Sequence, residues 1–225
     1  MVGRYVRYIA MGLVLGSGAC GTTMESSGAP QASAHAAPPE VLQPESALTV
    51  VPPSEAAAKM LAAAEKYIGE PYVFGGRLER SGCRRGGRSV TCQPGIDCQS
   101  LIFFAMEDTT GRSWRRFSVM PTVSVARGEL GQPVAGLNGV LREDLDPSML
   151  SPGDVLFFLM EDYNLENDGP LHTVGEQRYG TWHTGLFHGV KDGKYRVLHA
   201  APGERVRKQA LSDIPFDALF VTRME

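Results

Sequence analysis

Residues 21–54 limit how much of this chain can fold, because they lack the side chains that build a core. The segment contains six of the chain's 15 prolines, six alanines and five serines, but no Phe, Trp or Tyr. Such a composition buries too little apolar surface to offset the entropy lost when a chain is ordered. We therefore expect a disordered, semi-extended linker here. A single folded domain is expected over residues 55–225 of the 225-residue chain.

The first 20 residues have the pattern of a secretory signal peptide. Arg4 and Arg7 precede an apolar stretch, and small residues then lead to Cys20. The apolar stretch is about half the roughly 20 residues that a membrane-spanning helix needs. Small residues that end on a cysteine resemble a bacterial lipobox, although Ser17 stands where that motif usually has Leu. The prediction is export across the inner membrane of a bacterium and lipid anchoring at Cys20; simple cleavage beside an incidental cysteine is the alternative.

The overall charge and cysteine content exclude some classes of protein. A formal net charge of −3 gives no global positive field, so nucleic acid is not an expected partner. The chain has four cysteines, which are too few to build a disulfide-dominated scaffold. A hydrophobic fraction of 43% is ordinary for a globular domain, and we expect a monomer.

Two helices and four strands are predicted for the folded part. Ser54 is suited to cap a helix over residues 55–68, and Asp97 is suited to cap a second helix. Four segments have strand composition: residues 154–160, 182–188, 194–200 and 218–222. The Lys-Asp-Gly sequence at 191–193 is a hairpin signal. Because helices come first and antiparallel strands follow, we expect an α+β fold with N-terminal helices packed on a central antiparallel sheet.

A cysteine and two histidines form the candidate reactive group. Cys98 follows Asp97 and would lie in the first turn of a helix, where the helix dipole favours the thiolate by lowering the thiol pKa. His183 and His188 share a strand but point to opposite faces, so only one of them can face a helix packed on the sheet. The hairpin brings His199 alongside His183. These residues have the pattern of a nucleophile, a base and an orienting group.

Five segments in the same order resemble the motifs of the NlpC/P60 family of papain-like cysteine peptidases. They are Gly-Glu-Pro-Tyr-Val-Phe-Gly-Gly at 69–76, Gly-Ile-Asp-Cys-Gln-Ser-Leu at 95–101, Leu-Ser-Pro-Gly-Asp-Val-Leu-Phe-Phe at 150–158, His-Thr-Gly-Leu-Phe at 183–187 and Leu-His-Ala at 198–200. One such segment alone would be weak, but together they cover the length of the predicted domain.

The resemblance implies roles for four of these residues. Cys98 would be the nucleophile, His183 the base and His199 the residue that orients the imidazole. The Tyr72 hydroxyl would stabilise the oxyanion together with the Cys98 backbone N–H. The family cleaves amide bonds in bacterial cell-wall stem peptides, commonly between D-glutamate and diaminopimelate, and needs no metal or organic cofactor.

The chain also departs from the family pattern. Gln99-Ser100 stands where the family usually has Ser-Gly after the nucleophile, and Phe74 stands where it has Trp. Residues beside a nucleophile tend to contact substrate, so we expect Asp97 and Gln99 to do so. The Gln99 departure leaves the peptide specificity open.

The segment before the nucleophile, residues 77–93, is long and rich in arginine. Arg84 and Arg85 are candidates to attract substrate carboxylates; the alternative is a solvated loop. Cys83 and Cys92 have the spacing of a disulfide that closes a short loop in an oxidising compartment. No metal site is expected, because the chain has no Cys-x-x-Cys or His-Glu-x-x-His pair. This segment and residues 159–181 are predicted to rim the cleft.

The sequence therefore predicts a cysteine endopeptidase that acts on peptidoglycan stem peptides. Two alternatives remain open at this point. One is another acyl transfer on the same fold, as in an amidase or a transpeptidase. The other is a catalytically silent lipoprotein that binds the cell wall.

Overall fold

The computed structural model describes residues 48–76, 83–85, 88–90 and 95–225. Within that range the chain belongs to one compact unit, Pro44–Glu225. The predicted signal peptide, Cys20 and Cys92 lie outside the described residues. Lipidation and the Cys83–Cys92 disulfide therefore stay predictions.

Both predicted helices form, and each begins at its predicted cap. Helix α1 spans Glu55–Glu65, and the Ser54 side chain accepts a hydrogen bond from the Ala57 N–H. Helix α2 spans Cys98–Thr110 and ends at Gly111, which adopts the left-handed conformation with φ of 70°. Helix α1 is shorter than the predicted 55–68, because turns replace the helix before Gly69.

An antiparallel sheet of seven strands forms the centre of the domain, in the order β3-β9-β4-β6-β7-β8, with β5 paired to β6. The four predicted strands are confirmed as β4, β6, β7 and β9. The strands span β3 Gln132–Leu141, β4 Val155–Glu161, β5 His172–Val174, β6 Gln177–Lys191, β7 Lys194–Ala200, β8 Val206–Ala210 and β9 Ala218–Arg223. A separate pair, β1 Cys83–Arg85 and β2 Arg88–Val90, is antiparallel.

Short helices occupy the connections. They are η1 Trp114–Arg116, α3 Pro121–Ala126, η2 Arg142–Asp144, η3 Pro147–Met149, α4 Leu165–Asp168 and η4 Leu211–Asp213. Residues 159–181 are not one long loop, because β4 runs on to Glu161, and α4 and the β5–β6 hairpin follow. Within the described residues, no helix is long and apolar enough to cross a membrane.

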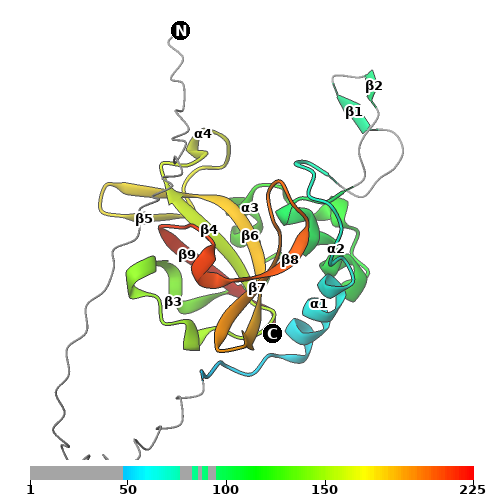
Figure 1. The fold of residues 1–225 in the computed structure, drawn as a ribbon. Helices are drawn as coiled ribbons and strands as arrows, with labels where there is room; N and C mark the ends of the chain where they lie inside the picture. Colours follow the sequence, from blue (N-terminus) through cyan, green and yellow to red (C-terminus); the bar gives the residue numbers. More distant parts are fainter. Residues whose placement is uncertain (1–47, 77–82, 86–87, 91–94) are drawn as a thin grey trace, which may run out of the picture. The chain divides into compact units, whose positions relative to one another are not determined.

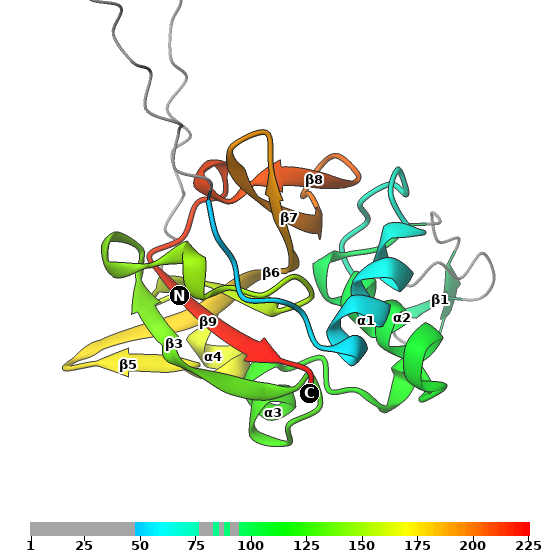
Figure 2. The same cartoon turned by 90° about the horizontal axis from the view of Figure 1, so that it is seen from below.

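The fold is α+β, with helices and sheet in separate layers. Helices α1 and α2 lie side by side and cover one face of the sheet, as Figures 1 and 2 show. Leu101 and Phe103 of α2 share a buried core with Phe157 of β4 and Leu186 of β6. A second core lies on the opposite face, where Phe158, Phe187 and Val197 pack with the 211–216 segment. The central strands are therefore buried on both sides.

Residues 48–54, which the composition assigns to the linker, are held against the domain. The Val51 N–H donates to the Leu150 carbonyl oxygen at 3.0 Å. The Ser151 hydroxyl donates to the Pro52 carbonyl oxygen at 3.0 Å. The Ser54 hydroxyl donates to the Met224 carbonyl oxygen at 2.6 Å. The folded part of the chain thus includes residues before the first helix.

Candidate active site

A cleft of about 340 Å³ brings together several of the predicted site residues. Its walls come from the turn at residues 74–75, the first turn of α2, the segment that leads into α3, the segment before α4, and the middle of β6 around His183. The lining residues are Phe74, Gly75, Asp97, Cys98, Gln99, Val119, Pro121, Tyr163, Asn164, Thr181, Trp182, His183 and Thr184.

Asp97 fixes the first turn of α2 and, with it, the position of Cys98. One carboxylate oxygen accepts hydrogen bonds from the Ser100 N–H at 2.7 Å and the Ser100 hydroxyl at 2.6 Å. The other oxygen accepts from the Gly75 N–H at 3.1 Å. The Asp97 carboxylate thus caps α2 and holds the neighbouring turn, and Asp97 also lines the cleft; its expected contact with substrate stays a prediction.

The Cys98 thiol is protonated more strongly than its helix position predicts. Burial raises the pKa of the thiol, and the negative charge of Asp97 raises it further. Interactions with the hydroxyl and backbone of Thr184 and with the Gln99 backbone lower the pKa but do not reverse the shift. The predicted lowering of the thiol pKa is therefore wrong, because burial and the charge of Asp97 outweigh the contacts that favour the thiolate.

His183 reaches the cleft from the face of the sheet that α1 does not cover. His188 is the histidine that faces a helix, since its Nε2 lies 2.7 Å from Glu65 Oε1 of α1. His183 pairs in register with Phe158 and stacks on its ring, on the opposite face. The alternation argument is correct, and His183 lies in the middle of β6, opposite Phe158 of β4, where its side chain and that of Cys98 both line the cleft.

The two predicted histidines are directly linked. His183 Nε2 lies 2.7 Å from His199 Nδ1, and both side chains are buried. Gly185 makes this close approach of β6 and β7 possible, because a Cβ there would lie 2.8 Å from Val197 Cγ1 and 3.1 Å from His199 Cβ. His199 Nε2 lies 3.1 Å from Gln209 Oε1 on β8.

Both imidazoles are neutral at neutral pH. Burial lowers the pKa of His183 to about 3, and the neighbouring His199 adds to the shift. Burial also lowers the pKa of His199 to about 4; the hydrogen bond to Gln209 opposes this shift and the charge of Arg207 adds to it. The resting site therefore holds a neutral thiol and a neutral base rather than an ion pair.

Tyr72 is not among the residues that line the cleft, although Cys98 is near enough to contribute to the pKa of its phenol, which keeps its proton. Burial raises the pKa of its phenol to about 12, with smaller contributions from Cys98, Asp97 and Tyr163. A bridge to Ile96, just before α2, positions its backbone. Its phenol is thus a hydrogen-bond donor at neutral pH.

The remaining predicted residues are placed differently. Gln99 lies on the cleft wall, and its Nε2 donates to the Val119 carbonyl oxygen at 2.9 Å, which joins α2 to the opposite rim. Arg84 and Arg85 belong to β1, and Cys83 begins it. Their side chains lie outside the described part of the chain, so their predicted roles stay predictions.

The sequence did not single out two threonines in the cleft. Thr181 Oγ1 and Thr184 Oγ1 are buried and have no N–H···O or O–H···O partner among the described residues. A buried hydroxyl without such a partner is costly, so it marks a place where a substrate group or the thiol can act as partner. Their positions within two residues of His183 in the sequence could have indicated that they lie in the cleft.

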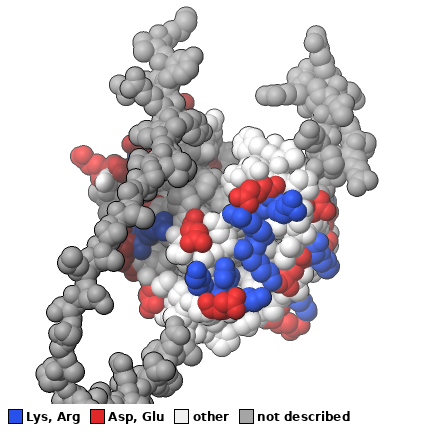
Figure 3. Space-filling model, in the orientation of Figure 1, with Lys and Arg blue, Asp and Glu red and all other residues white. Residues whose placement is uncertain are grey.

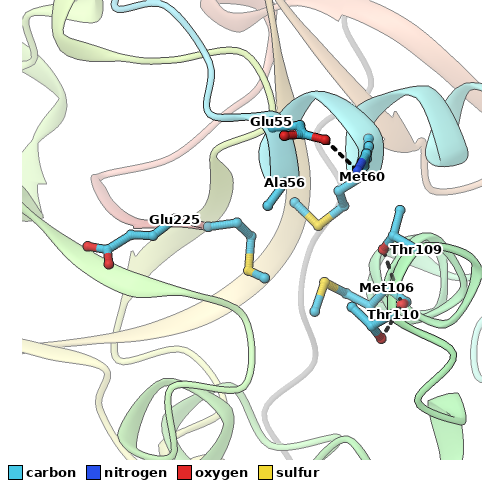
Figure 4. A pocket seen from close by; sticks show the side chains of 9 residues that line it. Glu55, Ala56, Met60, Met106, Thr109, Thr110 and Glu225 are labelled. Carbon is cyan, nitrogen blue, oxygen red and sulfur yellow. Dashed lines mark hydrogen bonds and ion pairs between the residues drawn. The ribbon is translucent and has the colours of Figure 1, made fainter.

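A second hollow lies away from this site, between α1, α2 and the C-terminal residues (Figure 4). Met60 and Met106 line it, and the Thr109 and Thr110 hydroxyls there donate to carbonyl oxygens of α2. It holds no cysteine or histidine. Within the described ranges, no group of three or more His, Cys, Asp or Glu residues is arranged to hold a metal ion.

Charges of both signs are interleaved on the outer face shown in Figure 3. The ion pairs of β7 and β8 include Arg196 with Asp192 and Arg207 with Glu204, the latter at 2.6 Å. Arg207 is thus held by a carboxylate on one side while it contacts Gln209 on the other.

No family model matches the chain. A curated relative, the gamma-DL-glutamyl hydrolase of Bacillus subtilis (strain 168), is 26% identical over 162 residues. The match covers 72% of this chain but only 27% of that protein, so the chain spans about a quarter of the relative's length.

Solved structures were also matched. The peptidoglycan hydrolase RipB of Mycobacterium tuberculosis is 20% identical, with a TM-score of 0.43 over 75% of this chain and 64% of that chain. RipD of the same organism, described as a non-catalytic NlpC/P60 domain protein, is 17% identical, with a TM-score of 0.41 over 76% and 99% of the two chains. An N-acetylmuramoyl-L-alanine amidase from Bacteroides uniformis is 12% identical, with a TM-score of 0.48 over 76% and 100%.

Proposed function

We propose that this chain, as a member of the NlpC/P60 family, is a cysteine hydrolase that cleaves amide bonds in bacterial cell-wall peptides. The observation that carries the proposal is the cleft in which Cys98, at the start of α2, lies with His183, which is linked to His199. The similarity to a protein named for γ-glutamyl hydrolysis supports a γ-glutamyl amide bond as the target. The bond between D-glutamate and diaminopimelate is one such bond.

The reaction begins with a neutral pair. As the Cys98 sulfur forms a bond to the substrate carbonyl carbon, the thiol proton passes to His183. His183 then gives this proton to the amine nitrogen as the C–N bond breaks, which leaves a thioester. His183 next takes a proton from a water molecule that attacks the thioester carbon. The C–S bond breaks, the carboxylic acid leaves, and the thiol regains its proton.

Two groups are suited to stabilise the oxyanion. The N–H groups of the first turn of α2 have no acceptor within the helix, and the Cys98 N–H is one of them. The Tyr72 phenol stays protonated, because burial raises its pKa to about 12. A protonated donor held near the reacting carbon stabilises negative charge as it develops.

The test is digestion of purified peptidoglycan fragments, with the new termini read by mass spectrometry. The parent protein is expected to release a free carboxylate and a free amine from the stem peptide. Cys98→Ala and His183→Gln are expected to lower the rate at least ~10³-fold. His188→Gln is the matched control, because His188 lies on the same strand but faces α1; its rate is expected to stay within about twofold of the parent.

The products also separate the alternatives. New termini at the muramoyl–alanine bond indicate an amidase, and joined peptides indicate transpeptidation. Binding without cleavage by an active-site-intact preparation indicates a silent wall-binding protein. Unchanged cleavage by Cys98→Ala would refute the assigned nucleophile.

Location outside the cytoplasm and a lipid anchor at Cys20 are part of the same proposal, and we expect a monomer. Support comes from the signal pattern at 1–20 and from the cell-wall substrate. Mass spectrometry of Cys20 in the membrane fraction tests it, and an unmodified cysteine there contradicts the anchor.

A further inference from the structure

The amide of Gln209 has a fixed orientation. Its Oε1 accepts a hydrogen bond from the Arg207 guanidinium at 2.8 Å, and its Nε2 donates to the Asp213 carbonyl oxygen at 3.1 Å. A guanidinium can only donate and a carbonyl can only accept, so both contacts identify the same end of the amide as the oxygen.

This oxygen determines which nitrogens of the histidine pair carry protons. Oε1 can only accept, so His199 Nε2, at 3.1 Å, must carry a hydrogen. Nδ1 of the neutral His199 is then an acceptor, and His183 Nε2, at 2.7 Å from it, must carry a hydrogen as well. His183 Nδ1 is left with a free electron pair.

We propose that Gln209 is a positioning residue that fixes the tautomers of both histidines, so that His183 presents an unprotonated Nδ1 to the nucleophile. The register supports this role, because His199 pairs with Arg207 and Val197 with Gln209, which places the three polar side chains on one face. Gln209 lies on β8, which β7 separates from β6, so it contacts His199 and reaches His183 only through it. The catalytic part of this inference rests on the proposed hydrolase function; the tautomer part does not.

Gln209 also limits where the proton can go. When His183 accepts the thiol proton, its Nε2–H still donates to His199. A primary amide oxygen does not take up a proton in this pH range, so the positive charge stays on the two histidines. The charged and titratable groups near them include Cys98 on α2, which lines the cleft with His183, and Arg207 on β8, which is paired with Glu204. Arg207 disfavours a positive charge on the resting pair.

The first test reads the tautomers directly, by nitrogen-15 NMR of the histidine rings without substrate. Both His183 and His199 are expected to carry hydrogen on Nε2 and none on Nδ1 at pH 7. Gln209→Met, which has a similar shape but no amide oxygen, is expected to give a mixture of His199 tautomers. A hydrogen on His183 Nδ1 in the parent protein would overturn the proposal, whatever the protein hydrolyses.

The second test is kinetic. Gln209→Met is expected to lower kcat ~10- to 100-fold and to change KM less than about threefold. Gln209→Glu keeps an acceptor and adds a negative charge; it is expected to recover most of kcat and to move the acidic limb of the pH profile upward, because the charge favours protonated histidine. Gln132→Met, an exposed replacement on β3, is the control and is expected to match the parent. Parent-like kcat in Gln209→Met, or equal losses in the Met and Glu variants, would refute the positioning role.

Discussion

At the scale of single residues, the site is built to hold its reactive groups uncharged. Burial raises the pKa of the Cys98 thiol and lowers the pKa values of His183 and His199 to about 3 and about 4. Both shifts favour the neutral forms, so in the proposed reaction proton transfer accompanies the attack of Cys98 on the substrate. Buried groups of this kind behave differently from a preformed thiolate–imidazolium pair.

Thr184 offers a way to separate thiol chemistry from stability. Thr184→Val removes a buried hydroxyl that has no oxygen or nitrogen partner but favours the thiolate. We expect iodoacetamide to alkylate Cys98 about 3- to 10-fold more slowly at pH 7, with unchanged or higher stability. Thr222→Val is the control, since the Thr222 hydroxyl donates to the Leu130 carbonyl oxygen at 2.6 Å; it should lose about 1–2 kcal/mol of stability and keep the alkylation rate. Equal alkylation rates in both variants would contradict the role of Thr184.

The buried histidines also predict how stability depends on pH. Their folded-state pKa values, about 3 and about 4, lie below the ordinary 6.5. Between pH 6.5 and pH 4 the unfolded chain therefore binds protons that the folded chain does not, so the free energy of unfolding falls as the pH is lowered. The expected loss between pH 7 and pH 5 is about 2 kcal/mol for each histidine, measured by urea unfolding. His199→Gln should show a smaller loss, and an equal loss in that variant would show that other groups are responsible.

At the scale of elements, short sequence signals correctly predicted the helix starts and the hairpin turn, which depend on neighbouring residues. Ser54 and Asp97 were recognisable as caps because a short polar side chain before an apolar stripe has a specific local partner. The hairpin signal at 191–193 likewise predicted that His199 lies near His183, because a tight turn sets the register of the two strands it joins. Edge strand β8 was missed, because its three polar residues lie between only two apolar ones and show no clear period. The contact between Gln209 and His199 therefore could not be predicted from the sequence.

Two short helices border the cleft, and hydrogen bonds between Thr122 and Asp168 join them. The Thr122 hydroxyl of α3 donates to the Asp168 carboxylate of α4 at 2.7 Å, next to the lining residues Pro121 and Asn164. Asp168→Ala is expected to raise KM about 3- to 10-fold with little change in kcat, because the rim loses the carboxylate contacts and keeps only the Thr122 hydroxyl bond to the backbone carbonyl, while the reacting groups stay in place. Proteolysis near residues 162–169 should become faster.

A matched variant tests whether the loss of any carboxylate that accepts a backbone N–H bond would also raise KM. Asp146→Ala removes a carboxylate that accepts from the Ser148 N–H in an exposed turn away from the cleft. Its KM is expected to equal that of the parent protein. If both variants raise KM alike, the α3–α4 contact has no specific part in binding.

At the scale of the whole molecule, residues 48–54 connect distant parts of the domain by hydrogen bonds. Their hydrogen bonds reach the turn before β4 and the residue after β9, which are far apart in sequence. Composition assigned these residues to the linker because they include no aromatic side chain. Backbone hydrogen bonds, which composition does not report, hold them in place.

Two truncated chains measure how much residues 48–54 contribute to stability. A chain that begins at residue 48 keeps these contacts, whereas one that begins at residue 55 also loses the cap of α1. We expect the shorter chain to be less stable by about 2–4 kcal/mol in urea unfolding, from a lost cap and two or three hydrogen bonds. Equal midpoints for the two truncations would show that the segment only rests on the surface.

The neutral, half-buried thiol has a consequence for the lifetime of the protein. Peroxides react with thiolates, and a thiol that stays protonated until substrate arrives presents little of that form. In an oxidising compartment, where no reducing system restores sulfinic or sulfonic acids, such a nucleophile outlasts an ionised one. The burial that slows the first proton transfer would thus protect the only cysteine on which the reaction depends.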